Sequence, residues 1–162
     1  MNRPNVLIIA LAFAVPAGAQ AHVAATPSTT TPGAYTAVAF RVGHGCDGKA
    51  TTALRIEIPA ALAQVRPRAI AGWRIAIEKT PDGRTSAVTW RGRLPEERFE
   101  TFELLFKAPD QPGPLYFPAI QTCAGAEAQW TEIPGPGAGP GGLSHPAPAV
   151  TVIPGDGAPA HH

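Results

Sequence analysis

The sequence lacks the residue patterns of common catalytic and metal-binding sites. Neither of the zinc spacings H-E-x-x-H and C-x-x-C occurs, and there is no complete glycine-rich phosphate loop and no serine in a nucleophile elbow. Charged side chains make up 15% of the chain, with 13 basic residues against 12 acidic ones. This balance excludes the basic footprint of a nucleic-acid-binding protein, and the scattered carboxylates form no evident catalytic pair. We therefore expect a protein that is not an enzyme and has no nucleic-acid partner.

Long apolar runs are also missing. The clearest run, residues 6–15, has about half of the roughly 20 residues that a membrane-spanning helix needs. It follows Arg3 and precedes Ala19-Gln20-Ala21, and together these form the three-part pattern of a secretory leader. The pattern predicts a signal peptide over residues 1–21 that is cleaved after Ala21. The mature chain would then begin at His22, be periplasmic or secreted, and have no membrane span; an uncleaved membrane anchor is the alternative.

Only two cysteines are present, Cys46 and Cys123. Thiols of exported proteins are usually oxidised, and two cysteines allow a single pairing within the chain. We therefore predict a Cys46–Cys123 disulfide, which on the chain-entropy argument constrains the unfolded chain by about 4–5 kcal/mol. The alternative use of the two sulfurs, in a site for a soft metal ion, requires both thiols to be reduced.

Short segments with alternating apolar and polar residues dominate the rest of the chain. Such alternation is typical of half-buried strands, and helical structure is expected only as one turn over Ala60–Val65. The pattern predicts an all-β fold, an antiparallel β-sandwich of the immunoglobulin or cupredoxin kind with one disulfide. Strands are expected over Val23–Pro27, Tyr35–Val42, Thr51–Ile58, a hairpin at 73–91, Phe99–Lys107, Leu115–Cys123 with an interruption at Pro118, and Glu127–Ile133, with a turn over Ser28–Gly33.

Much of the proline and glycine, 19 and 17 residues in all, lies near the C-terminus. This composition predicts a tail over residues 135–162 that contributes nothing to the core. An edge strand at 149–153 is the one element expected in it. The folded domain is therefore expected over residues 22–134.

The five histidines are the remaining candidates for chemistry, and His22 is the most specific of them. As the first residue of a mature chain it offers its α-amine and its imidazole Nδ1 to the same ion in a chelate ring. An α-amino group ordinarily has a pKa of about 7.7–8.0, so a divalent ion displaces its proton at modest cost. Nitrogen donors in tetragonal geometry favour Cu(II). The alternative is that cleavage merely leaves a histidine at the terminus.

The other histidines make weaker cases. His44 stands between two glycines close to Cys46, where it is either a second ligand or part of a flexible polar loop. The position of His145 in the Pro- and Gly-rich tail predicts a solvated side chain. His161 and His162 form either a weak terminal metal site or a pair without a role.

One carboxylate and three tryptophans also need to be weighed. Glu57 lies on the face of its predicted strand opposite Leu54, Ile56 and Ile58. From the strand alone it is either a solvent-facing carboxylate paired with a cation or an oxygen ligand of copper. Large aromatic residues usually fill the core of a sandwich, which is the default for all three tryptophans, Trp73, Trp90 and Trp130.

Several short motifs occur in a fixed order along the chain. They are His22-Val23, Thr31-Pro32-Gly33, Leu54-Arg55-Ile56-Glu57-Ile58-Pro59, Gly72-Trp73, Leu115-Tyr116-Phe117-Pro118, Gln121-Thr122-Cys123 and Trp130-Thr131-Glu132-Ile133-Pro134. Their order and spacing, over about residues 22–134, resemble those of the YcnI-like family of bacterial envelope proteins.

The resemblance implies a β-sandwich that binds Cu(II) through a brace made by a single N-terminal histidine. His22 would supply the amine and the imidazole, and Glu57 the carboxylate that completes the coordination. Trp130, in preference to Trp73, would lie beside the metal. The resemblance also implies a role in copper homeostasis or delivery outside the cytoplasm, with other periplasmic copper-handling proteins as partners.

Two other functions fit the same features. A copper-dependent oxidase of the polysaccharide monooxygenase type also begins with a mature histidine on a sandwich fold. Its brace needs a second histidine, for which His44 and His145 are the candidates. A metal-free interaction sandwich fits the predicted fold equally well and makes His22 incidental.

Overall fold

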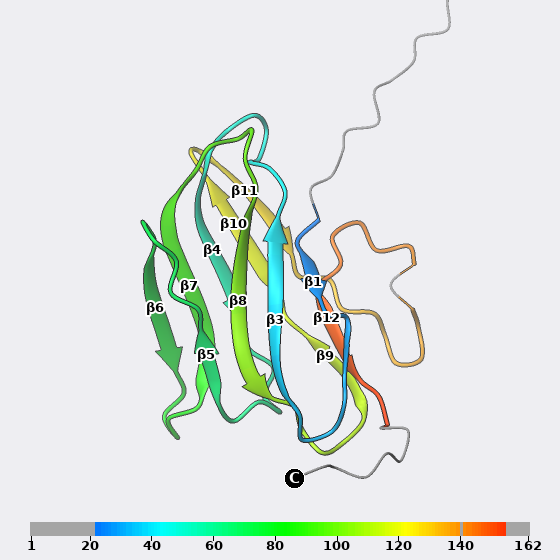
Figure 1. Cartoon of the computed structure of the whole chain (residues 1–162). Coiled ribbons are helices and arrows are strands. Elements are labelled where there is room, and N and C mark those ends of the chain that lie inside the picture. The colour runs from blue at the N-terminus through cyan, green and yellow to red at the C-terminus, as the bar shows by residue number, and fades with distance from the viewer. Residues whose placement is uncertain (1–21, 140, 155–162) are drawn as a thin grey trace, which may run out of the picture.

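The structure, a computed structural model, describes residues 22–139 and 141–154, in which every regular element is a β-strand (Figure 1). A four-stranded sheet has the order β1 (Ala24–Thr26), β3 (Tyr35–Val42), β8 (Glu100–Lys107) and β5 (Val65–Pro67). A five-stranded sheet has the order β11 (Ala126–Trp130), β10 (Ala119–Cys123), β4 (Thr51–Glu57), β7 (Thr85–Leu94) and β6 (Arg74–Lys79). A smaller sheet contains β2 (Thr29–Thr30), β12 (Ala149–Val152) and β9 (Gly113–Tyr116), in that order.

The predicted all-β sandwich is confirmed, and both large sheets are antiparallel throughout. No helix in the described part of the chain has the length and apolarity needed to cross a membrane. The predicted signal peptide, residues 1–21, and the terminal pair His161 and His162 lie outside the described residues.

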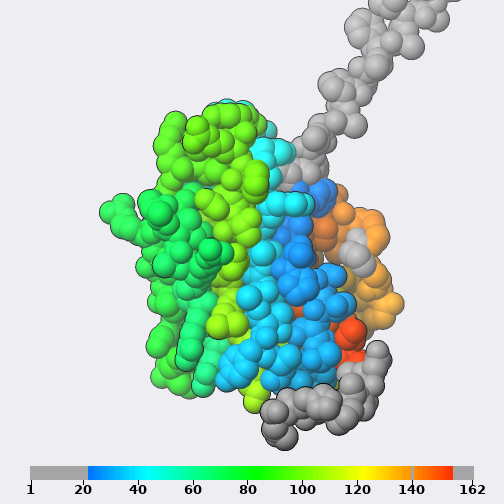
Figure 2. Space-filling model, in the orientation of Figure 1, coloured from blue at the N-terminus to red at the C-terminus, as the bar shows by residue number. Residues whose placement is uncertain are grey.

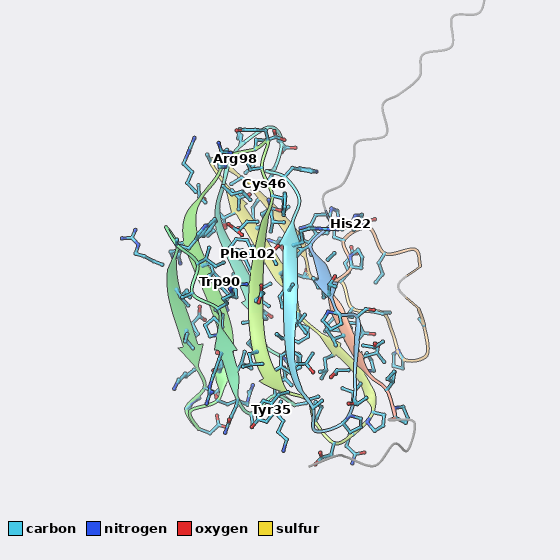
Figure 3. All side chains as sticks on the ribbon, in the orientation of Figure 1. His22, Tyr35, Cys46, Trp90, Arg98 and Phe102 are labelled. Carbon is cyan, nitrogen blue, oxygen red and sulfur yellow. A yellow bond between two sulfur atoms is a disulfide. The ribbon has the colours of Figure 1, made fainter. Side chains whose placement is uncertain are left out.

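The core lies between the two large sheets, where the apolar residues of alternating strands meet. On β3 and β8, Phe40 is paired with Phe102, and both side chains are fully buried. Trp90 of β7 approaches Phe102 from the opposite sheet, with 5.4 Å between ring centroids (Figure 3). The indole nitrogen of Trp90 donates a hydrogen bond to the carbonyl oxygen of Arg68 at 3.2 Å, so its burial leaves no polar group unpaired.

Strands with a long alternating pattern form where the pattern predicts them. β3 has the predicted bounds, β4 ends one residue early, and β6 and β7 form the predicted hairpin around the turn at Pro81. On β8, Phe102, Leu104 and Phe106 face the core as predicted. A period of two residues is enough to fix which face of a strand is buried when the strand has six or more residues.

Two short segments differ from the prediction. The helical turn expected over Ala60–Val65 is wrong, because a turn closed from Leu62 N to Pro59 O at 3.0 Å is followed directly by β5. β5 pairs with β8 and is an edge strand of the four-stranded sheet. The expected turn over Ser28–Gly33 contains the two-residue strand β2, which pairs with β12. Strands this short hold too few residues to show a period.

Pro118 divides the segment Leu115–Cys123, as predicted, but its two halves belong to different sheets. Proline lacks the N–H that a continuous strand would need, so the ladder ends there. β9 before it pairs with β12, and β10 after it lies between β4 and β11. The proline is therefore the point at which the chain moves from the small sheet to the five-stranded one.

The C-terminal segment contributes more to the fold than its composition predicts. β12 is the middle strand of its sheet rather than an edge strand, and Val150 and Val152 are 0% and 1% exposed. The preceding residues run beside the start of the chain, as the orange and blue surfaces in Figure 2 show. The folded part therefore continues to Val152 and does not end at Pro134, because buried valines can come from a segment that is otherwise rich in proline and glycine.

Candidate functional site

β1 places His22 at one end of the four-stranded sheet. Ala24 pairs with Arg41 of β3, so the antiparallel register continued by two residues brings His22 opposite Gly43. The neighbouring Val23 is only 4% exposed and anchors this end of the chain in the core, whereas His22 itself is exposed (Figure 3). The domain thus begins with an accessible histidine held by a buried neighbour.

The side chain next to His22 is Trp130, the last residue of β11. The centroids of the imidazole and the indole are 5.0 Å apart, with 41° between the ring planes. Trp130 is 3% exposed and belongs to the core, but its Nε1 has no hydrogen-bond partner among the described residues. An indole N–H can only donate, so this atom is a buried donor beside an exposed histidine.

His145 packs against the same indole, with 5.1 Å between ring centroids. Its backbone is fixed by Glu132: His145 N donates to the Glu132 carboxylate at 2.8 Å, and Glu132 N donates to His145 O at 3.0 Å. The prediction of a solvated side chain is therefore wrong, because His145 is half-buried. The only signal for this contact in the sequence is the apolar pair Val150 and Val152 further along, which fixes the segment to the sandwich.

Trp73 has a different environment from Trp130. Its ring meets Phe102 edge-on at 4.9 Å and packs against the core. It also lies directly over Gly92, where an added Cβ would come within 2.5 Å of the indole. Of the two tryptophans weighed for a place beside His22, the structure brings Trp130 there and uses Trp73 in packing.

Glu57 lies on the opposite face of the five-stranded sheet from Trp130. Ala119 of β10 is paired with both Ile56 and Trp130, so these side chains share the inner face. Glu57 follows Ile56 and points outward, where its side chain is 50% exposed and 4.0 Å from Arg55. The prediction that Glu57 shares a site with His22 and Trp130 is therefore wrong in this geometry. Among the described residues, no three His, Cys, Asp or Glu side chains are grouped to hold a metal ion.

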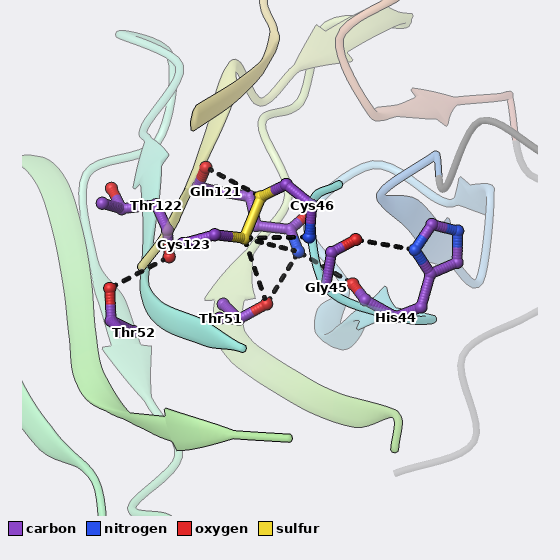
Figure 4. Close-up of a disulfide and its surroundings, with 8 residues drawn as sticks. All are labelled: His44, Gly45, Cys46, Thr51, Thr52, Gln121, Thr122 and Cys123. Atoms are coloured by element: carbon purple, nitrogen blue, oxygen red, sulfur yellow. Dashed lines mark hydrogen bonds between the residues drawn. A yellow bond between two sulfur atoms is a disulfide. The ribbon is translucent and has the colours of Figure 1, made fainter. Parts of the chain in front are cut away.

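The loop that carries His44 is fixed by the predicted disulfide, which is confirmed (Figure 4). Cys46 and Cys123 are 5.9 Å apart between Cα atoms and join this loop to the end of β10. Gln121 is fully buried, and its amide donates to His44 O and to Thr51 Oγ1, both at 2.8 Å. The alternative of a flexible loop at His44 does not agree with these contacts.

Comparisons with known proteins agree with this fold. No curated protein matches the chain. A solved structure titled "Crystal structure of an uncharacterized protein from Nocardia farcinica reveals an immunoglobulin-like fold" is similar, with a TM-score of 0.67 and 26% sequence identity. The similarity covers 81% of this chain and 97% of that one. A family described as "Domain of unknown function (DUF1775)" matches residues 22–152, from His22 to the end of β12, and the chain therefore belongs to the DUF1775 family and has an immunoglobulin-like β-sandwich.

Proposed function

We propose that the protein binds Cu(II) outside the cytoplasm through a His22 that becomes N-terminal when residues 1–21 are removed. The observation that carries this proposal is the contact of the exposed His22 ring with Trp130, at 5.0 Å, at the point where the folded domain begins. The amine and Nδ1 of one N-terminal histidine form a chelate ring, and nitrogen donors favour Cu(II) over other divalent ions of its series. The protein holds or delivers copper and performs no turnover of its own.

The residue at which the family match begins supports the proposed removal of residues 1–21. The match begins at residue 22, so residues 1–21 do not belong to the conserved domain. These residues have the pattern of a secretory leader, and a leader is removed from the mature protein. Within DUF1775 we assign the chain to the YcnI-like proteins, on the order of the motifs between His22 and Pro134, and with them to copper handling in the periplasm.

The chemistry of Trp130 fits an ion beside His22. A buried N–H without a partner costs about 1–3 kcal/mol, so an acceptor at this point would be stabilising. A water molecule or an anion brought in with copper would be an acceptor of the kind that Nε1 of Trp130 lacks. The indole also excludes water from one side of the imidazole, which supports a defined geometry for the ion.

Adding one residue before His22 tests the proposal. The processed protein and the extended variant are titrated with Cu(II) against a competing chelator, and the copper spectra are recorded by electron paramagnetic resonance. We expect the extension to weaken Cu(II) binding by at least about a hundredfold, because it removes a ligand. Loss of a residue that only orients a metal ligand already lowers metal affinity by about 10–100-fold. A variant with one residue added after His162 is the matched control and should bind like the native protein.

Two outcomes would contradict the proposal. Equal affinity of the extended and native proteins would exclude the amine as a ligand. Failure of the processed protein to bind Cu(II) more tightly than a His22→Ala variant would favour the metal-free sandwich instead.

Replacing Glu57 with glutamine should leave Cu(II) affinity within about twofold of the native value, because residues that do not contact a ligand rarely contribute to its binding. Its carboxylate faces away from Trp130 and lies near Arg55 on the outer surface. The same titration measures the affinity of this variant, with Glu127→Gln, an exposed-surface change on strand β11 of the same sheet, as the control. A tenfold or larger loss of Cu(II) affinity in the Glu57 variant, without such a loss in the control, would show that Glu57 is a copper ligand.

A further inference from the structure

The imidazole of His44 is held in a tautomer that suits a metal ligand. Its Nδ1 lies 2.7 Å from the carbonyl oxygen of Gly45. A carbonyl oxygen can only accept, so in the neutral imidazole Nδ1 carries the proton and Nε2 has the free lone pair. A ligating histidine almost always donates its other ring N–H in this way, and a backbone carbonyl is one of the usual acceptors.

The loop around His44 is rigid for reasons that do not involve its side chain. Cys46 and Lys49 form a closed pair of backbone hydrogen bonds at 3.2 and 3.0 Å. Gly45 packs so closely on this turn that an added Cβ would be 1.8 Å from Lys49 O. The disulfide from Cys46 and the hydrogen bond from Gln121 to His44 O connect the loop to β10. Ligands held in advance by such contacts bind with a smaller loss of conformational entropy.

The same loop lies at the end of the sheet where His22 is placed. The pairing of β1 with β3 ends at Ala24 opposite Arg41, and the same register extended by two residues places His22 at the level of Gly43, the residue before His44. Figure 4 shows the His44 imidazole on the side of the loop that faces the start of β1, away from the disulfide. Two histidines that are 22 residues apart in the sequence are therefore brought to one end of the β1–β3 pair.

We propose that His44 is a second imidazole ligand, which binds through Nε2 the copper ion held by His22. This inference rests on the proposed function and changes its ligand set, since the site then contains an amine and two imidazoles, the donors of a two-histidine brace, in place of a single histidine. His145 is the competing histidine, but in the described part of the chain no hydrogen bond fixes its tautomer, and its ring is engaged with Trp130. The proposed site replaces the carboxylate expected from Glu57 with a nitrogen donor.

The test compares His44→Ala with His145→Ala in the processed protein that begins at His22. Cu(II) affinity is measured by chelator competition, and pulsed electron paramagnetic resonance counts the coordinated imidazoles. We expect two imidazoles in the native protein and in His145→Ala, and one in His44→Ala with at least about tenfold weaker binding. The hydrogen bond from the His44 side chain reaches only the adjacent Gly45 O and does not close the loop. Circular dichroism and a thiol assay verify the fold and the disulfide of the variants.

The outcomes separate this inference from the proposed function. A native spectrum with one imidazole, unchanged in His44→Ala, would overturn the role of His44 while leaving the amine and imidazole of His22 intact. A loss of one imidazole in His145→Ala, and none in His44→Ala, would assign the second ligand to His145. An extended N-terminus that binds as well as the native one would instead overturn the site at His22 itself.

Discussion

A variant that ends at Pro134 is expected to be unfolded at room temperature, although composition places the domain boundary there. It loses β12, whose Val150 and Val152 are almost completely buried between β2 and β9 and the core. Burial of a valine side chain contributes about 1.5–3 kcal/mol, so these two contribute about 3–6 kcal/mol together. The net stability of a domain is only about 5–15 kcal/mol, and the variant also loses the backbone hydrogen bonds of two strand pairs.

A variant that ends at Pro154 is the matched control, because it removes only residues beyond the described domain. Its midpoint of thermal unfolding should stay within about 2 °C of the full chain, as expected for changes outside the core. Circular dichroism in the far ultraviolet and two-dimensional amide NMR distinguish the two variants. A cooperative transition at the native temperature in the shorter variant would show that β12 is dispensable and that the boundary lies near residue 134.

The difference between the predicted and the observed boundary has a simple physical origin. The alternation of apolar and polar residues identifies a strand only when it continues over several residues. This is the case in β3, β4 and β8, which have seven or eight residues each. β2, β5 and β12 have two to four residues and are stabilised by partners that are distant in the sequence. Their existence depends on tertiary pairing, which no local pattern contains.

The candidate site, too, could be predicted only in part from local sequence patterns. The alternation of Leu54, Arg55, Ile56 and Glu57 correctly predicts that Glu57 points away from the core. From the strand alone Glu57 is either a solvent-facing carboxylate or a copper ligand, and the resemblance favours the ligand. That role conflicts with the orientation of Glu57, because Trp130 lies on the inner face. The neighbourhood of His22 and Trp130 was also expected from resemblance alone, and here the two rings are in contact. The contact of His145 with Trp130 depends on the path of the segment before β12, which composition does not reveal.

Replacing both Cys46 and Cys123 with alanine is expected to lower the free energy of unfolding by about 3–5 kcal/mol. The disulfide joins residues 77 apart in the sequence, and for a loop of this length the chain-entropy model gives about 4.5 kcal/mol. For a domain of this size the midpoint of thermal unfolding should fall by roughly 10–20 °C. Alanine is the suitable replacement because both cysteines are buried, and serine would bury unpaired hydroxyl groups.

Thr52→Ala is the matched control at the same end of the sandwich. The Thr52 hydroxyl donates to Thr122 O at 3.2 Å, and loss of one such half-buried hydrogen bond should cost about 1 kcal/mol. Chemical denaturation measures both variants, and a thiol reductant should destabilise the native protein but not the double alanine variant. A loss below about 1 kcal/mol in the double variant would contradict the entropic account. If the loop also presents His44 to copper, the double variant should bind Cu(II) more weakly than Thr52→Ala even under conditions where both are fully folded.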